Sequence, residues 1–155
     1  MIVGFDLGTA TGVAWLMEYH SNPPGRDRKT ITSETWNLPK QDNARMYHQF
    51  RIHLRAAFEK TKPNLVIYEE PCTRMSKAWA AIFYGLRAIL LCECEARQIP
   101  WVPIHPSECK KYAGMSGTAK KADVQMFALH RWPDMPRRQD EMDARFIALA
   151  GLHVM

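Results

Sequence analysis

The chain has 155 residues and a mass of 17.9 kDa, which suffices for one domain with a single well-formed core. Hydrophobic residues make up 46% and charged residues 24%, a composition that excludes a chain disordered along its whole length. Lysine and arginine total 21 against 16 acidic residues, and the net charge of +5 suits a polyanionic partner. We therefore expect one domain, residues 1–155.

The cysteines and the apolar stretches indicate a reducing, membrane-free setting. Cys92 and Cys94 fall two positions apart in one expected helix, so they face different ways, and the four cysteines have neither disulfide-framework nor zinc-site spacing. The longest apolar stretch, 78–92, is interrupted by Arg87 and is too short to span a bilayer. Met1 leads straight into an apolar strand without the basic segment of a secretory signal. We expect a cytoplasmic protein with no membrane association.

Hydrophobic periodicity predicts the elements in chain order. Alternating or continuous apolar runs predict strands at 2–6, 13–15, 29–36, 65–68 and 100–104. Apolar residues at helical spacing predict helices at 42–60, 76–97, 120–131 and 140–152. Together these describe an α/β fold, in which a mixed five-stranded sheet carries helices on its faces.

Four carboxylates stand where they could converge at one edge of this sheet. Asp6 ends the first strand after four apolar residues, and Glu69 ends the fourth strand. Asp140 and Asp143 lie three residues apart at the start of the last helix, so they project from one face. Each acid also has an ordinary interpretation, as a turn cap, a solvated strand end or a helix N-cap.

The four acids taken together indicate a metal centre. Carboxylates gathered at one place repel one another unless cations lie between them. Oxygen ligands without histidine or cysteine favour Mg²⁺ or Mn²⁺, and two such ions about 4 Å apart can activate a water and stabilise the leaving oxygen of a phosphodiester. Glu70 follows Glu69 directly and therefore faces the opposite side of the strand, so the two cannot share one role.

Four segments resemble, in order and at similar spacing, the RuvC family of Holliday junction resolvases. They are GFDLGTATG at 4–12, LVIYE at 65–69, GTAKKADV at 117–124 and DEMDA at 140–144. The resemblance implies a ribonuclease-H-like fold, a homodimer, and a crossover junction endodeoxyribonuclease that nicks four-way DNA junctions in pairs with Mg²⁺. It also implies two ions held by Asp6, Glu69, Asp140 and Asp143, with Lys121 near the scissile phosphate. The compact size suits a phage-type or divergent member, working in a bacterial or phage-infected cell.

Two regions depart from the family's pattern. Resolvases of this family place an aromatic side chain shortly after the strand-end acid, whereas Pro71, Cys72 and Thr73 stand there in this chain. The loop around 21–28 is also longer than expected. Junction opening and the preference for a cleavage sequence are the properties that these departures affect.

Basic residues flank the acidic positions along the chain. We expect them to contact DNA phosphates on both sides of the cut and to make binding salt-dependent. The candidates are Arg74, Lys77, Lys110, Lys111, Lys120, Lys121, Arg137 and Arg138.

The helix at 76–97 carries more apolar surface than one sheet face needs. Two symmetric nicks call for two active sites related by a twofold axis, so we expect part of this helix to form a dimer interface, although core burial accounts for much of the apolar surface. The apolar residues are Trp79, Ile82, Phe83, Leu86, Ile89, Leu90 and Cys94.

Three other functions are compatible with parts of this pattern. Residues 6–12 also resemble the first phosphate motif of actin and heat-shock ATPases, but those proteins need two lobes and this chain is long enough for one. A ribonuclease-H-like nuclease could instead act on other branched DNA or on structured RNA. A non-catalytic junction-binding protein is disfavoured by the presence of all four acids.

Overall fold

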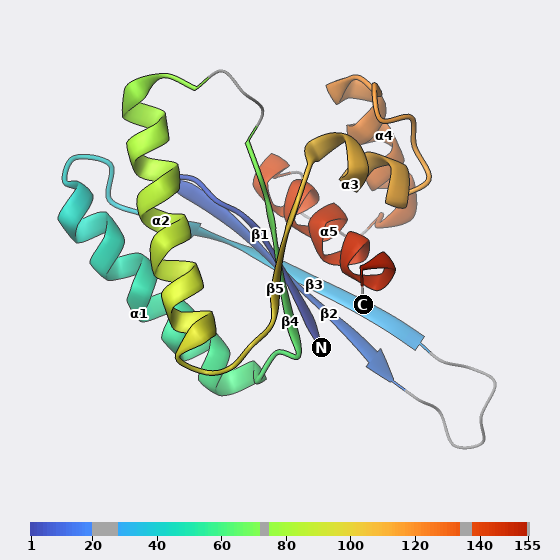
Figure 1. The fold of residues 1–155 in the computed structure, drawn as a ribbon. Coiled ribbons are helices and arrows are strands. Elements are labelled where there is room, and N and C mark those ends of the chain that lie inside the picture. The colour runs from blue at the N-terminus through green and yellow to red at the C-terminus, as the bar shows by residue number, and fades with distance from the viewer. Residues whose placement is uncertain (20–27, 72–74, 134–137, 155) are drawn as a thin grey trace.

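The computed structural model describes residues 1–19, 28–71, 75–133 and 138–154, and it shows an α/β fold (Figure 1). The strands are β1 (Ile2–Asp6), β2 (Ala10–Tyr19), β3 (Arg28–Asn37), β4 (Leu65–Glu69) and β5 (Trp101–Ile104). The helices are α1 (Asn43–Thr61), α2 (Lys77–Glu95), α3 (Pro106–Tyr112), α4 (Lys121–Arg131) and α5 (Gln139–Ala150), followed by a 3₁₀ turn at Gly151–His153. Across these ranges, no helix combines the length and the apolar character that crossing a membrane requires.

The five strands form one mixed sheet in the order β3-β2-β1-β4-β5. β1, β2 and β3 pair antiparallel, while β1 pairs parallel with β4 and β4 parallel with β5. Phe5 lies opposite Tyr68 in the parallel pair. Since the next residues are Asp6 and Glu69, the two acids end neighbouring strands at the same edge of the sheet. The five predicted strands and the mixed sheet are confirmed.

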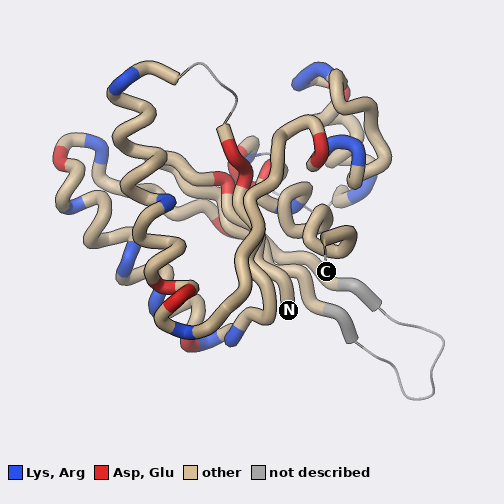
Figure 2. Tube along the Cα trace, in the orientation of Figure 1, with Lys and Arg blue, Asp and Glu red and all other residues tan. Residues whose placement is uncertain are grey.

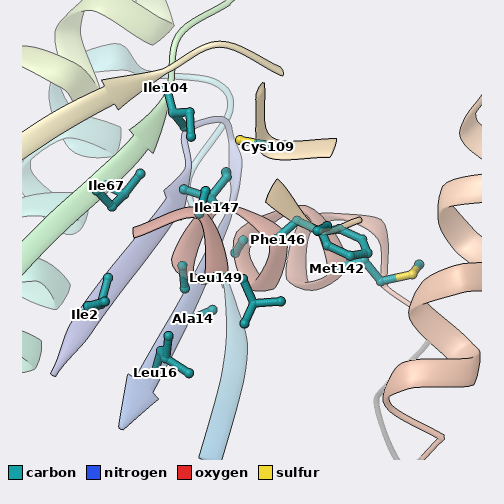
Figure 3. Packing of buried hydrophobic residues seen from close by; sticks show 14 of the residues in the cluster. Ile2, Ala14, Leu16, Ile67, Ile104, Cys109, Met142, Phe146, Ile147 and Leu149 are labelled. Carbon is teal, nitrogen blue, oxygen red and sulfur yellow. The ribbon is translucent and has the colours of Figure 1, made fainter. Parts of the chain in front are cut away.

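Helices cover both faces of the sheet, as predicted (Figure 1). On one face, α1 and α2 pack over Val3, Phe5 and Tyr68. α1 is held by Met46, Phe50, Leu54 and Phe58, which recur every four residues and are all buried. On the other face, Ile2 and Ile67 of the sheet meet Phe146 and Ile147 of α5, and α3 and α4 add Cys109 and Val124 (Figure 3).

α5 lies against the sheet at unusually short range because two glycines face it. A Cβ atom on Gly4 would stand 2.5 Å from the backbone nitrogen of Ala148 and 2.6 Å from the carbonyl oxygen of Ala144. A Cβ atom on Gly12 would overlap the carbonyl group of Asp140. The missing side chains therefore let α5 rest directly on the sheet, with its first turn on Gly12 of β2 and its later turns on Gly4 of β1.

The short helix α3 is the element that hydrophobic periodicity does not predict. The side chain of His105 accepts a hydrogen bond from the backbone of Ser107, and Glu108 accepts one from the backbone of His105. Pro106 occupies the first helical position, where its missing N–H costs nothing. The helix buries Cys109 and turns Lys110 toward the edge of the sheet where the acids lie.

Candidate metal centre

Asp6 and Glu69 point to the same side of the sheet. Side chains alternate along a strand, so each acid shares a face with the residue two positions earlier. For Asp6 this residue is Gly4, which faces α5, and for Glu69 it is Ile67, which packs under α5. Both carboxylates therefore lie beneath the first turns of α5.

α5 brings the other two acids to the same place. Asp140 lies within the first turn, and the residue at the N-cap is Arg138, so Asp140 is not the helix cap that its position would also allow. Asp143 follows three residues later on the same side of the helix. Figure 2 shows acidic positions gathered where the central strands end, beside basic positions on neighbouring helices.

The electrostatics of Asp6 show that the four carboxylates are neighbours. Burial raises the pKa of Asp6 well above its usual range, and the charges of Asp143, Glu69 and Asp140 raise it further, in that order. The turn that follows Asp6 is closed by Thr11, whose hydroxyl donates to the carbonyl of Gly8 at 2.6 Å. Asp6 therefore lies close to three other acids, and the turn that begins directly after it is closed by the side chain of Thr11.

Burial and repulsion also raise the pKa values of Glu69 and Asp143. Burial raises the pKa of Glu69 to about 7, with a further contribution from Asp143 and an opposing one from Lys110. For Asp143, burial is again the largest cause of a raised pKa. A hydrogen bond from Gln139 and the charges of Lys121 and Lys110 oppose this rise, while Asp140 adds to it.

A cavity of about 250 Å³ opens beside these acids. Both negatively and positively charged side chains line this cavity, namely two carboxylates and two ammonium groups. It is lined by Glu69, Asp143, Lys110, Lys121, Gln139, Pro106 and Val124. Lys121 is the first residue of α4, and Lys110 donates to the carbonyl of Ala119 at 2.9 Å. The structure thus places Lys110, predicted only as a DNA contact, at the acidic site itself.

The acids are gathered but do not yet surround a common point. Among the described residues, no group of three or more acidic, histidine or cysteine side chains stands close enough to hold a metal ion as it is. The donor set nevertheless fits a divalent cation, because oxygen ligands predominate and buried carboxylates that repel one another gain from a shared positive charge.

The other predicted DNA-binding residues are either exposed or outside the described part of the chain. Lys77, Lys111, Lys120 and Arg138 are exposed, and Arg138 donates to the side chain of Asn37 at 3.4 Å. Arg74 and Arg137 lie outside the described residues, as do Cys72 and Thr73 and positions 21–27 of the predicted loop.

Glu70 turns away from the centre, as strand alternation predicts. Its carboxylate lies 3.6 Å from a guanidinium nitrogen of Arg87 on α2, on the opposite face of the sheet from α5. Its backbone N–H donates to the carbonyl of Ile104 and extends the pairing with β5. Glu70 therefore links β4 to α2.

Comparison with known proteins places this arrangement among known folds. No model of a protein family matches the sequence, and no curated protein matches it. Among solved structures, RuvC from Thermus thermophilus aligns with a TM-score of 0.79 at 18% identity, over 96% of this chain and 91% of that one. The chain has the RuvC-type fold.

Two further structures with this RuvC-type fold were solved for junction resolvases. Thermus thermophilus RuvC in complex with Holliday junction substrate also aligns with a TM-score of 0.79 at 18% identity, over 96% of this chain and 90% of that one. The yeast mitochondrial Holliday junction resolvase aligns with a TM-score of 0.63 at 18% identity, over 96% of this chain and 76% of that one. The predicted ribonuclease-H-like α/β class is confirmed.

Proposed function

We propose that this chain is a divalent-metal-dependent DNA endonuclease that resolves four-way junctions by paired symmetric nicks. The observation that carries the proposal is the convergence of four carboxylates, three of them with raised pKa values, beside two lysines at one edge of the sheet. The RuvC-type fold supports it, because one structure with that fold holds a Holliday junction substrate.

The four acids would hold the metal, and the two cavity lysines would face the substrate phosphate. Asp6, Glu69, Asp140 and Asp143 supply carboxylate oxygens, which suit two Mg²⁺ ions, with Mn²⁺ able to substitute. When bound, such ions activate a water and stabilise the leaving oxygen of a phosphodiester. The ammonium groups of Lys121 and Lys110 would balance negative charge that develops on the scissile phosphate.

The exposed bases would hold the DNA backbone on both sides of this centre. If metal ions neutralise the four acids, 21 bases face 16 − 4 = 12 remaining acids, and the net charge rises from +5 to +9. Lys77, Lys111, Lys120 and Arg138 are exposed, and we include Arg74 and Arg137 from the sequence. Because these contacts are to phosphates, junction affinity should fall steeply as salt is raised.

We propose that two copies pair through the exposed side of α2. Phe83, Leu86 and Leu90 are committed to the core of the chain, whereas Trp79 and Tyr84 are 41% and 51% exposed. A twofold pairing would give the two active sites that symmetric nicks require. Sedimentation should show a dimer that Tyr84→Glu dissociates, and a wild-type monomer at working concentration would rule out the pairing.

The decisive experiment is cleavage of a synthetic four-way junction. Wild-type protein should cut it in Mg²⁺ and not in EDTA, and should cut fork, flap, duplex and structured RNA substrates less. Asp6→Asn should abolish cutting yet still bind the junction, because the substitution removes a metal ligand and leaves the exposed bases in place. Junction binding without any cutting in Mg²⁺ or Mn²⁺ would instead indicate a non-catalytic junction-binding protein.

A further inference from the structure

Two glutamine side chains connect α4 to the acidic site. The Nε2 atom of Gln139 lies 2.8 Å from Oδ1 and 2.9 Å from Oδ2 of Asp143, so the amide donates into the fork between the two carboxylate oxygens. The Nε2 atom of Gln125, on α4, donates in turn to Oε1 of Gln139 at 2.9 Å. We call this chain of hydrogen bonds the glutamine relay.

The relay can run in one direction only. An ionised carboxylate accepts hydrogen bonds and cannot donate them, so Gln139 must turn its NH₂ group toward Asp143. Its carbonyl oxygen then faces the other way and needs a donor, which the NH₂ group of Gln125 provides. Gln125 therefore fixes the orientation of the Gln139 amide without touching Asp143.

The relay attaches the acidic site to the helix that carries the active-site lysine. Gln125 stands four residues after Lys121 on α4, so the two side chains lie on one side of that helix. Between them, Val124 is buried in the core under α5. One face of α4 thus supplies an ammonium group to the cavity, a buried contact to the core, and the donor that orients Gln139.

We propose that Gln139 is a positioning residue for the metal centre and that Gln125 holds it in its working orientation. This inference rests on the proposed function, because it assumes that Asp143 is a metal ligand. Because the amide of Gln139 donates to both carboxylate oxygens of Asp143, this carboxylate cannot rotate freely. The plane of the Asp143 carboxylate is therefore fixed before a cation binds. Partners that orient metal ligands in this way typically change metal affinity or activity by about 10–100-fold when they are removed.

The test is direct binding of Mn²⁺ to the full chain without DNA, followed by calorimetry. Gln139→Met keeps the volume and removes the donor, and it should weaken Mn²⁺ binding by about 10-fold or more. Gln125→Met should cause a smaller loss in the same direction, because Gln139 stays but can flip. Gln49→Met is the matched control, since Gln49 also bonds a side chain four residues away, His53 on α1, and its loss should leave Mn²⁺ affinity unchanged.

A fourth variant separates positioning from mere support of the fold. Gln139→Asn keeps the amide but shortens the side chain by one methylene, which withdraws the donor from Asp143 without adding charge, so it should weaken Mn²⁺ binding about as much as Gln139→Met does. Thermal unfolding of each variant without metal shows whether the folded protein is retained. A structural role alone would lower the unfolding temperature and leave the Mn²⁺ affinity of the folded protein unchanged, which would overturn the inference.

The outcomes for the inference and for the proposed function differ. If the wild type binds Mn²⁺, Asp143→Asn weakens that binding and Gln139→Met does not, the relay has no positioning role and the nuclease proposal stands. If the wild type binds no Mn²⁺, both fail.

Discussion

Lys110 and Lys121 should differ in their effects from neighbouring lysines that do not line the acidic cavity. Both line the cavity with Glu69 and Asp143, whereas Lys111 does not line it. Removing a charge that is aimed at the reacting phosphate costs the transition state more than the bound substrate, on the order of 10²-fold in rate. Lys110→Ala and Lys121→Ala should therefore slow single-turnover cleavage far more than they weaken junction binding in Ca²⁺.

Lys111→Ala is the matched control for this prediction. It should weaken binding slightly, through one lost phosphate contact, and leave the cleavage rate of bound junction unchanged. If Lys121→Ala lost affinity rather than rate, Lys121 would be a phosphate anchor, and the same holds for Lys110.

Single residues differ in how far the sequence reveals their place. Asp6 and Glu69 could be predicted to converge, because each ends an apolar strand and alternation along the strand sets the side on which it points. Lys110 could not, since its approach to Glu69 depends on the turn into α3. Gln139 carried no signal at all, because a glutamine beside an acid is common and only the placement of α4 makes it a link.

Of the contacts between secondary-structure elements, the one between α5 and the sheet should tolerate a larger side chain least. Gly12→Ala would drive a Cβ atom into the carbonyl group of Asp140 and push the first turn of α5 away from the sheet. Overpacking of this kind costs about 1–3 kcal/mol, and here it also displaces two of the four acids. Denaturant unfolding should show the loss of stability, and Mn²⁺ binding should weaken with it.

Gly8→Ala provides the comparison at a nearby turn. Its Cβ atom would meet only the carbonyl oxygen of Ala10, at 3.7 Å, which is ordinary contact. Equal losses of stability in the two variants would mean that the close contact with α5 does not explain why residue 12 must be glycine.

Elements were predicted well where their hydrophobic pattern was long enough. α1 shows four apolar residues at four-residue spacing, and β4 is a continuous apolar run, so both stand out. α3 has seven residues and buries only Cys109, which is too little to give a period. Its start was nonetheless encoded, since Pro106 at the first position and Glu108 at the third are typical of a helix N-terminus.

At the scale of the whole molecule, the acidic site should cost the metal-free protein stability. The folded-state pKa of Glu69 is about 7, above the ordinary value of 4.5 for a glutamate. The folded protein therefore keeps a proton that the unfolded chain releases between pH 4.5 and 7, and its stability falls as pH rises through this interval. Because a pKa unit corresponds to about 1.4 kcal/mol, Glu69 alone contributes a loss on the order of 3 kcal/mol.

Thermal unfolding in EDTA from pH 5 to pH 8 tests this, with Glu69→Gln as the reference that cannot ionise at this position. The wild type should lose stability relative to Glu69→Gln as pH rises, and Asp6→Asn should be more stable than the wild type at pH 8 because it removes a buried charge that repels its neighbours. Mg²⁺ should restore the wild type most strongly at high pH, since ions bind the folded state and compete with protons for the same oxygens. Parallel curves for wild type and Glu69→Gln across this range would mean that neither burial nor the charge of Asp143 raises the pKa of Glu69, and the argument that this site needs a cation would fail.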